Sequence, residues 1–317
     1  MKTNVKVNNY KQYPITTSPL YRLSNKRTLE SLIGLKKYSL NKISEQIRYS
    51  DFTIAKKDGK ERPVTAPCPY LKRVQKSLYV LLLRIEKPDW LISGSKGKCY
   101  IDNAKYHQRN QSQYALTLDI KNFYPSCTRA YVFSFFANTM KMPNDVAGTL
   151  TDILTYRTSI PVGSPTSQLL AFFAYKEMFE ELHSMAKSHD CIFTVYVDDL
   201  AFSSNAPINQ QNLISDVAFI LGKSGHKLKW KKKKSYSKNE SKLFTGVILD
   251  KNNQLKIPNN LHNKIRFGKE RLDGVGGMEK KERDIFKKQL YGRIISARGI
   301  EQSSYPELAV AVKAIKV

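Results

Sequence analysis

Hydrophobic and polar residues alternate with two different periods along this chain, which predicts both helices and strands. The helical period is clearest in residues 70–87, where apolar side chains recur along one face and lysine and arginine lie mostly elsewhere. The same period predicts helices over residues 23–35, 38–49, 129–140, 144–156, 168–189, 212–225, 261–272 and 283–297.

Short apolar runs bounded by turn residues predict strands instead. Residues 114–120 form one expected buried strand that ends in an acid, and residues 193–204 form two strands joined at Asp198 and Asp199. Residues 242–250 predict one further strand, and residues 51–67 a hairpin that turns at Asp58 and Gly59. Helices and strands in this order predict an α+β fold with a mainly antiparallel sheet.

The charge of the chain is strongly positive and unevenly distributed. Its 53 lysine and arginine residues exceed its 27 aspartate and glutamate residues by 26. Residues 1–115 carry 23 basic and 8 acidic side chains and residues 223–317 carry 24 and 9, but residues 116–222 carry 6 and 10. An enzyme that acts on nucleic acid needs basic surfaces for phosphates and carboxylates for metal ions, which this pattern favours. Uneven solvated surface charge is the simpler alternative.

Three aspartates are the candidates for chemistry. Asp119, Asp198 and Asp199 interrupt apolar strands inside the acidic third of the chain. A single aspartate at a strand end more often forms a turn, but carboxylates on adjacent strands can converge. Two Mg²⁺ ions roughly 3.5–4 Å apart would suit such a group, since carboxylate oxygens are ligands that Mg²⁺ selects in phosphoryl transfer.

These acids lie in sequences that resemble the catalytic motifs of reverse transcriptases. Residues 196–200 read Tyr-Val-Asp-Asp-Leu, residues 119–126 match the preceding motif, and residues 161–167 resemble the Pro-Gln-Gly loop of that family. The resemblance implies a right-hand polymerase that copies RNA into DNA. It assigns residues 1–115 to the amino-terminal helices and fingers, 116–250 to the palm with a helical insertion near 129–157, and 251–317 to a helical thumb.

Two further motifs narrow the resemblance to bacterial retron reverse transcriptases. Residues 103–107 read Asn-Ala-Lys-Tyr-His, and Phe244-Thr245-Gly246 stands where that group carries Val-Thr-Gly. The resemblance implies a cognate structured noncoding RNA, priming from an RNA 2′-hydroxyl, a branched RNA-DNA product, and antiphage defence with a separate effector protein. The alternatives are another small bacterial reverse transcriptase, of group II intron or abortive-infection type, and a catalytically silent RNA-binding scaffold.

The resemblance also implies roles at the catalytic centre. Asp119 and Asp198 would hold two Mg²⁺ ions, with the Ile120 carbonyl and Asp199 completing or orienting the shell. The deoxynucleoside triphosphate would contact four residues, namely Arg62, Phe123, Gly163 and Lys232. Phe123 would exclude a 2′-hydroxyl unless it is a core residue, and any lysine of residues 231–234 could act at the triphosphate. Val162 replaces the usual glutamine of the loop, which leaves its role open.

A larger set is expected to bind RNA or template through phosphate pairing and base stacking. Its members are Lys72, Asn103, His107, Trp230, Thr245, Gly246, Lys264, Arg266, Arg271, Lys287 and Arg293. For His107, the alternative is a hydrogen-bonded structural group. The first residues lack the apolar core of a secretory signal and no apolar run is long enough to span a membrane, so we expect a cytoplasmic protein without a membrane partner.

Overall fold

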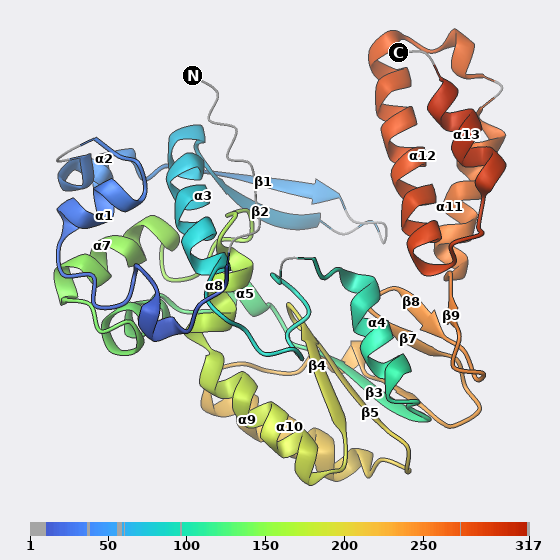
Figure 1. Ribbon diagram of the computed structural model, residues 1–317, viewed down its shortest axis with the longest axis horizontal. Helices are drawn as coiled ribbons and strands as arrows, with labels where there is room; N and C mark the ends of the chain where they lie inside the picture. The colour runs from blue at the N-terminus through green and yellow to red at the C-terminus, as the bar shows by residue number, and fades with distance from the viewer. Residues whose placement is uncertain are drawn as a thin grey trace.

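A computed structural model describes residues 11–36, 39–55, 59, 61–95, 97–272 and 274–315 of the protein. The described residues form three sheets, all antiparallel, that are combined with helices as Figure 1 shows. The predicted α+β class with a mainly antiparallel sheet is therefore confirmed. In the predicted hairpin turn, Asp58 lies outside the described residues.

The amino-terminal part combines helices with a long hairpin. Asn25 caps the first helix, since its side-chain oxygen accepts the Thr28 backbone N–H at 2.9 Å. A proline begins the amphipathic helix α3, as its missing N–H allows at a first helical position. The elements are η1 (Ile15–Thr17), α1 (Lys26–Leu32), η2 (Ser39–Lys42), α2 (Ile43–Gln46), β1 (Tyr49–Ala55), β2 (Glu61–Pro67) and α3 (Pro69–Leu83).

The central sheet has the strand order β4-β5-β3-β6. Helices α9 and α10 pack side by side beneath it in Figure 1 and bury the apolar side chains that the strands present to them. The bounds are β3 (Tyr114–Asp119), α9 (Lys176–Ser188), β4 (Ile192–Tyr196), β5 (Asp199–Ser204), α10 (Gln210–Lys223) and β6 (Lys234–Tyr236).

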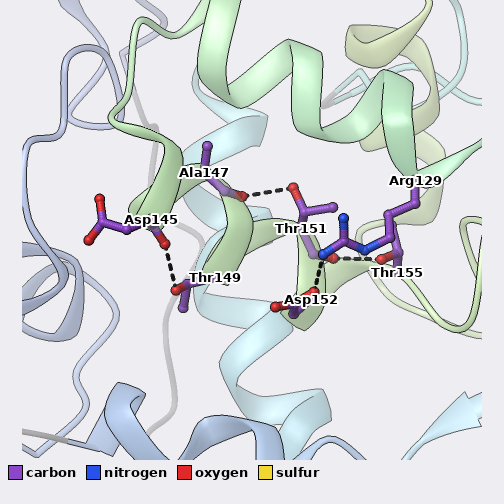
Figure 2. A network of polar contacts seen from close by, with 7 residues as sticks. All are labelled: Arg129, Asp145, Ala147, Thr149, Thr151, Asp152 and Thr155. Carbon is purple, nitrogen blue, oxygen red and sulfur yellow. Dashed lines mark hydrogen bonds and ion pairs between the residues drawn. The ribbon is translucent and has the colours of Figure 1, made fainter.

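A helical layer links this sheet to the amino-terminal part. In α7, three threonine hydroxyls donate to backbone carbonyls four residues earlier, as Figure 2 shows for Thr149, Thr151 and Thr155. These bonds satisfy polar groups that are almost fully buried. Arg129 pairs with Asp152 and so fastens α6 to α7. The bounds are α5 (Phe123–Ser126), α6 (Arg129–Ser134), the π-helix η3 (Phe135–Thr139) and α7 (Asn144–Leu154).

The prediction of one continuous helix over residues 168–189 is wrong. The segment forms two helices, α8 (Ser167–Ala174) and α9, that meet at Tyr175. The buried Tyr175 hydroxyl accepts the Thr128 backbone N–H at 2.9 Å and donates to the Ser126 carbonyl at 3.2 Å. The sequence has neither proline nor glycine at Tyr175 to end the helix. The break coincides instead with this tertiary contact.

The single strand predicted over residues 242–250 is instead a hairpin of two strands. Thr245 and Gly246 form its turn, with φ of 45° and 91°, the arrangement that favours glycine in a two-residue hairpin loop. Helix α4 packs against this third sheet. The bounds are α4 (Tyr100–Arg109), η4 (Trp230–Lys232), β7 (Lys242–Phe244), β8 (Val247–Leu249) and β9 (Leu255–Lys256).

The carboxyl-terminal helices stand apart from the rest in Figure 1 and bury their own apolar cluster around Ile265, Leu290 and Ile294. The amino-terminal and central parts, by contrast, share one large core. In the described part of the chain, no helix has both the length and the apolar character to cross a membrane. The bounds are α11 (Asn259–Glu270), η5 (Val275–Gly277), α12 (Lys280–Ile300) and α13 (Pro306–Ala314).

Gln75, on α3, joins three segments inside the shared core. Its amide nitrogen donates to the Ile153 carbonyl at 2.8 Å and to the Tyr49 hydroxyl at 2.9 Å. Its amide oxygen accepts the Ser164 hydroxyl at 2.8 Å. The side chain is completely buried. Removal of its amide would therefore leave each of these groups without a hydrogen-bond partner, and water could not take its place.

We predict that Gln75→Met, which keeps the volume but removes the amide, lowers the free energy of unfolding by about 1–3 kcal/mol. Urea denaturation measures the change. Lys76→Ala is the matched control, because Lys76 is exposed on the same helix and its removal should cost less than about 0.5 kcal/mol. Equal stability of Gln75→Met and the wild type would contradict the prediction.

Candidate active site

The acids that lie far apart in the sequence meet at one end of the central sheet. Asp119 is the last residue of β3 and pairs in register with Asp199, the first residue of β5. Asp198 lies in the turn between β4 and β5, and its carbonyl accepts the Ile120 backbone N–H at 2.9 Å. Strand pairing therefore brings both acidic motifs to the same place.

The carboxyl groups perturb one another because they are close and poorly solvated. Burial, followed by the charge of Asp119, raises the pKa of Asp198. Burial, followed by the charge of Asp198, raises the pKa of Asp199 to about 6, and a hydrogen bond with the Asp119 side chain adds to this. Asp119 itself is only 3% exposed. The site thus concentrates negative charge where water can screen it little.

One lysine balances part of this charge. Residues 227–229 run antiparallel to residues 119–121, with the Lys229 N–H donating to the Asp119 carbonyl at 2.8 Å. The short helix η4 that follows turns the Lys232 ammonium onto the Asp119 carboxylate. Burial lowers the pKa of Lys232, but its hydrogen bond to Asp119 and the charges of Asp119, Asp199 and Asp198 together outweigh burial and raise it. The structure thereby selects Lys232 among the four lysines at 231–234.

The donor set fits magnesium as that ion is usually held. Among the residues described, no three His, Cys, Asp or Glu side chains form a complete metal cage. Mg²⁺ is commonly bound by one or two carboxylates, with water and substrate phosphates filling its other positions. A divalent cation would also offset the mutual repulsion that raises the pKa of Asp198 and Asp199. The carboxylates of Asp119 and Asp198 would therefore suffice, with water and substrate phosphates as the other ligands.

Phe123 and Tyr124, which follow Asp119 in the sequence, differ in their surroundings. Burial raises the pKa of Tyr124, the charge of Asp198 adds to this shift, and the Arg62 guanidinium opposes it. Phe123 is 5% exposed and packs against the rings of Phe179 and His226 in the core. In the sequence, two adjacent aromatic residues do not indicate which one points into the core.

Gly163 fixes the loop before α8 against the hairpin. Its N–H donates to the Thr65 carbonyl at 3.0 Å, and a Cβ on this residue would lie 2.5 Å from that same oxygen. Only glycine allows so close an approach of the two backbones. The neighbouring Val162 lines a groove of about 480 Å³ between the hairpin and the loop, together with Phe52 and Tyr156. The loop thus forms one wall of an open groove.

Residues 54–249 match the family model described as reverse transcriptase (RNA-dependent DNA polymerase). The chain belongs to this reverse transcriptase family.

Curated relatives of this reverse transcriptase chain include retron enzymes, so the predicted resemblance is confirmed. It is 28% identical to the retron Se72 reverse transcriptase of Salmonella heidelberg over 199 residues, which are 62% of this chain and 52% of that one. It is 26% identical to the retron Ec83 reverse transcriptase of Escherichia coli over 230 residues, 66% of this chain and 70% of that one. The chain spans about half the length of the first relatives it matches.

A solved structure agrees on the fold. Telomerase from Candida albicans, in complex with a fragment of telomeric RNA, superimposes with a TM-score of 0.50 and 12% identity, over 92% of this chain and 69% of that one. At that identity the likeness concerns the fold alone. Together with the family match, it confirms the right-hand polymerase fold expected of this reverse transcriptase.

Asn103 and His107, expected at the RNA, are completely buried. The His107 ring nitrogens lie 2.6 Å from the Ser203 hydroxyl and 2.8 Å from the Thr194 hydroxyl, and Thr194 also donates to the Asn103 amide oxygen. The His107 ring stacks on Phe244 with centroids 4.2 Å apart. Contrary to the expectation above, neither side chain is available to RNA in this conformation, and His107 is the structural group of the alternative interpretation.

This network joins the two motifs that narrowed the resemblance. The Asn103 amide donates to the Thr245 hydroxyl at 3.3 Å, and that hydroxyl donates to the Tyr100 carbonyl at 2.9 Å. Gly246, beside it, is exposed at the tip of the β7–β8 turn. Asn103 and Thr245 thus fasten α4 to the hairpin, while Gly246 remains at the surface.

Of the other expected RNA-binding residues, Lys264 is half-buried on α11, and the rest fall into two groups. Lys287 donates to the Ile315 carbonyl at 2.6 Å, and Arg293 to the Lys264 carbonyl at 3.3 Å, so both cations help to hold the carboxyl-terminal helices together. The second group is exposed and consists of Lys72, Trp230, Arg266 and Arg271. Within it, Arg266 and Arg271 form exposed ion pairs with Glu270 and Glu282, which are weak and exchangeable.

Burial lowers the pKa of His107 from 6.5 to about 3. Below pH 6.5 the imidazole therefore binds a proton in the unfolded chain but not in the folded chain. The free energy of unfolding consequently decreases as the pH falls below 6.5. We predict that the stability gap between the wild type and His107→Gln narrows by about 2 kcal/mol between pH 7 and pH 5. Denaturant unfolding at both pH values measures the gap, and a constant gap would contradict a buried neutral imidazole.

Proposed function

We propose that this chain is a retron-type reverse transcriptase that makes DNA on a cognate structured noncoding RNA with two Mg²⁺ ions. The observation that carries the proposal is the convergence of Asp119 and Asp198 on Lys232 within the segment that matches the reverse transcriptase family. The similarity to retron Se72 reverse transcriptase supports the subgroup. The proposed parts are fingers to residue 115, palm over 116–250 and thumb from 251.

The residues around the acids have separate proposed roles. Asp119 and Asp198 hold the ions, and the Ile120 carbonyl and Asp199 complete or orient the shell. When bound, Mg²⁺ aligns and stabilises the attacking and leaving oxygens of phosphoryl transfer. Arg62, on the exposed end of β2, grips the triphosphate, because its planar guanidinium binds phosphate oxygens in pairs.

Lys232 is proposed to act on the departing pyrophosphate. Its ammonium already lies at the catalytic carboxylate Asp119, and it remains half-exposed. An incoming triphosphate with its cations offers the lysine a new anionic partner. The lysine would then neutralise or protonate the leaving group, as the position of its side chain beside the acids allows.

The exposed cations and Trp230, which is 63% exposed, are proposed to bind the noncoding RNA and its DNA product. Priming from a 2′-hydroxyl of that RNA would give a branched RNA-DNA product. We further propose that the protein acts in the cytoplasm, in antiphage defence, with a separate effector protein. The similarity to retron enzymes supports these finer points, which the geometry of the site alone does not address.

Primer extension on an RNA template tests the enzyme. We predict that Asp198→Asn lowers DNA synthesis by about a thousandfold or more, since one metal ligand loses its charge. Asp145→Asn is the matched control, because Asp145 is exposed at the start of α7. Equal synthesis by the wild type and Asp198→Asn would leave only an RNA-binding scaffold.

Sequencing of the RNA that copurifies with the protein tests the subgroup. A single dominant structured RNA, recovered joined to DNA through a 2′-linkage, is the expected result. Recovery of an intron RNA or of heterogeneous RNA would favour the other small reverse transcriptases.

Substitution of the two adjacent aromatic residues tests which one faces the sugar. We propose that Tyr124, beside Asp198 and Arg62, closes off the sugar 2′ side in place of Phe123. Tyr124→Ala should therefore raise ribonucleotide incorporation at least about tenfold relative to deoxynucleotide incorporation, because bulk is removed at that position. Phe123→Ala should instead lower stability by about 3–5 kcal/mol, since it empties a core site. Single-nucleotide incorporation and urea denaturation measure these effects, and the reverse outcome would restore Phe123 to the sugar.

A further inference from the structure

The turn that carries Asp198 has an unusual backbone. Tyr196 pairs with Asp199, which leaves a two-residue loop of Val197 and Asp198. Of these two, only Val197 has a positive φ, 62°. This is the arrangement of a type II′ hairpin turn, whose first central position strongly favours glycine. A β-branched residue with positive φ is strained, and such strain persists only where the surrounding structure enforces it.

The side chain of Val197 makes packing contacts that a glycine at this position would lack. It is partly buried and packs against the large core. The packing holds the residue in place but does not by itself select the strained backbone. A second contact must therefore hold the peptide group.

That contact comes from Ser93, about a hundred residues earlier in the chain. The Val197 backbone N–H donates to the Ser93 hydroxyl oxygen at 2.9 Å, and Ser93 is only 4% exposed. This hydrogen bond acts on the residue that immediately precedes Asp198. The Ile120 N–H donates to the carbonyl of Asp198, the other residue of the turn.

The segment before Ser93 is itself fixed to the central sheet. The Val195 N–H donates to the Trp90 carbonyl, and the Ile92 N–H donates to the Val195 carbonyl, both at 3.0 Å. The next residue, Gly94, approaches α8 so closely that a Cβ would lie 2.7 Å from a Leu169 methyl. Ser93 is thus a rigidly held group.

We propose that Ser93 is a positioning residue that locks the strained turn and thereby sets the direction of the Asp198 carboxylate. The inference rests on the proposed role of Asp198 at the metal ions. Without the Ser93 hydroxyl, the Tyr196–Val197 peptide can rotate toward an unstrained conformation of Val197, which would displace the Asp198 carboxylate relative to Asp119. The lock acts on the rate of the chemical step and not on nucleotide binding, since the Ser93 hydroxyl contacts the backbone of the turn and Ser93 is not among the residues proposed to contact the nucleotide.

Steady-state primer extension with Ser93→Ala tests the lock. We expect kcat to fall by about tenfold to a hundredfold, the range that misplacement of a reacting group by about 1 Å can produce. The KM for deoxynucleotide should stay within about twofold. Ser95→Ala is the matched control: its hydroxyl, in the same loop, donates to the Leu91 carbonyl and does not touch the turn. An unchanged kcat in Ser93→Ala would overturn the proposal.

A second background separates a lock from general damage. Val197→Gly relieves the strain, so in that background the loss caused by Ser93→Ala should shrink to about threefold or less. Hydrogen exchange provides a readout independent of activity: the peptide that contains the Val197 amide should exchange faster in Ser93→Ala while the unfolding midpoint is unchanged. An equal loss of kcat in both backgrounds, or unchanged exchange, would refute the lock. Failure of the proposed function looks different, since the wild type would then be as inactive as Asp198→Asn.

Discussion

Repulsion between buried carboxylates is the constraint around which this molecule is organised. Asp119, Asp198 and Asp199 lie together in a place that water reaches poorly, and the raised pKa values of Asp198 and Asp199 record the cost. A protein selected for stability alone would separate these groups or replace them. Their juxtaposition is maintained by strand pairing, by the backbone bond from Ile120 to Asp198 and by the Lys232 ammonium.

The surrounding scaffold is correspondingly rigid and rich in specific polar contacts. The Asn103–Thr194–His107–Ser203 network fastens a helix to the back of the catalytic strands, with every bond between buried groups. Gln75 does the same on the opposite side, where it joins the hairpin, α7 and the loop of Ser164. Such fully satisfied networks specify one arrangement more sharply than apolar packing does.

Part of the candidate site could be predicted from the sequence, and part could not. The three aspartates stood out because they interrupt apolar strands, and strand periodicity was enough to place them. Spacing could not choose Lys232 among four adjacent lysines, because a single 3₁₀ turn decides which one meets Asp119. Likewise Phe123 and Tyr124 are adjacent, and only the direction of a short helix sends one into the core.

The buried polar residues were the hardest to foresee. Asn103 and His107 look like surface residues in a polar helix, since their partners Thr194 and Ser203 lie about 90 residues away. The break at Tyr175 has the same origin, because its hydroxyl bonds to a segment 47 residues earlier. Local patterns report backbone preference and amphipathic faces, but they carry no information on which distant hydroxyl will satisfy a buried group.

The separate core of α11–α13 has a mechanical consequence. These helices bury an apolar cluster of their own, and they contact the rest of the protein near the end of α12, where a Cβ on Gly299 would lie 2.8 Å from an Ile101 methyl. The Ile257 N–H, bonded to the Glu301 carboxylate at 2.8 Å, ties both ends of the unit together at the same place. These contacts lie at one end of the long helix α12. A rotation about that end would displace the far ends of the helices most and would leave the acids of the central sheet in place.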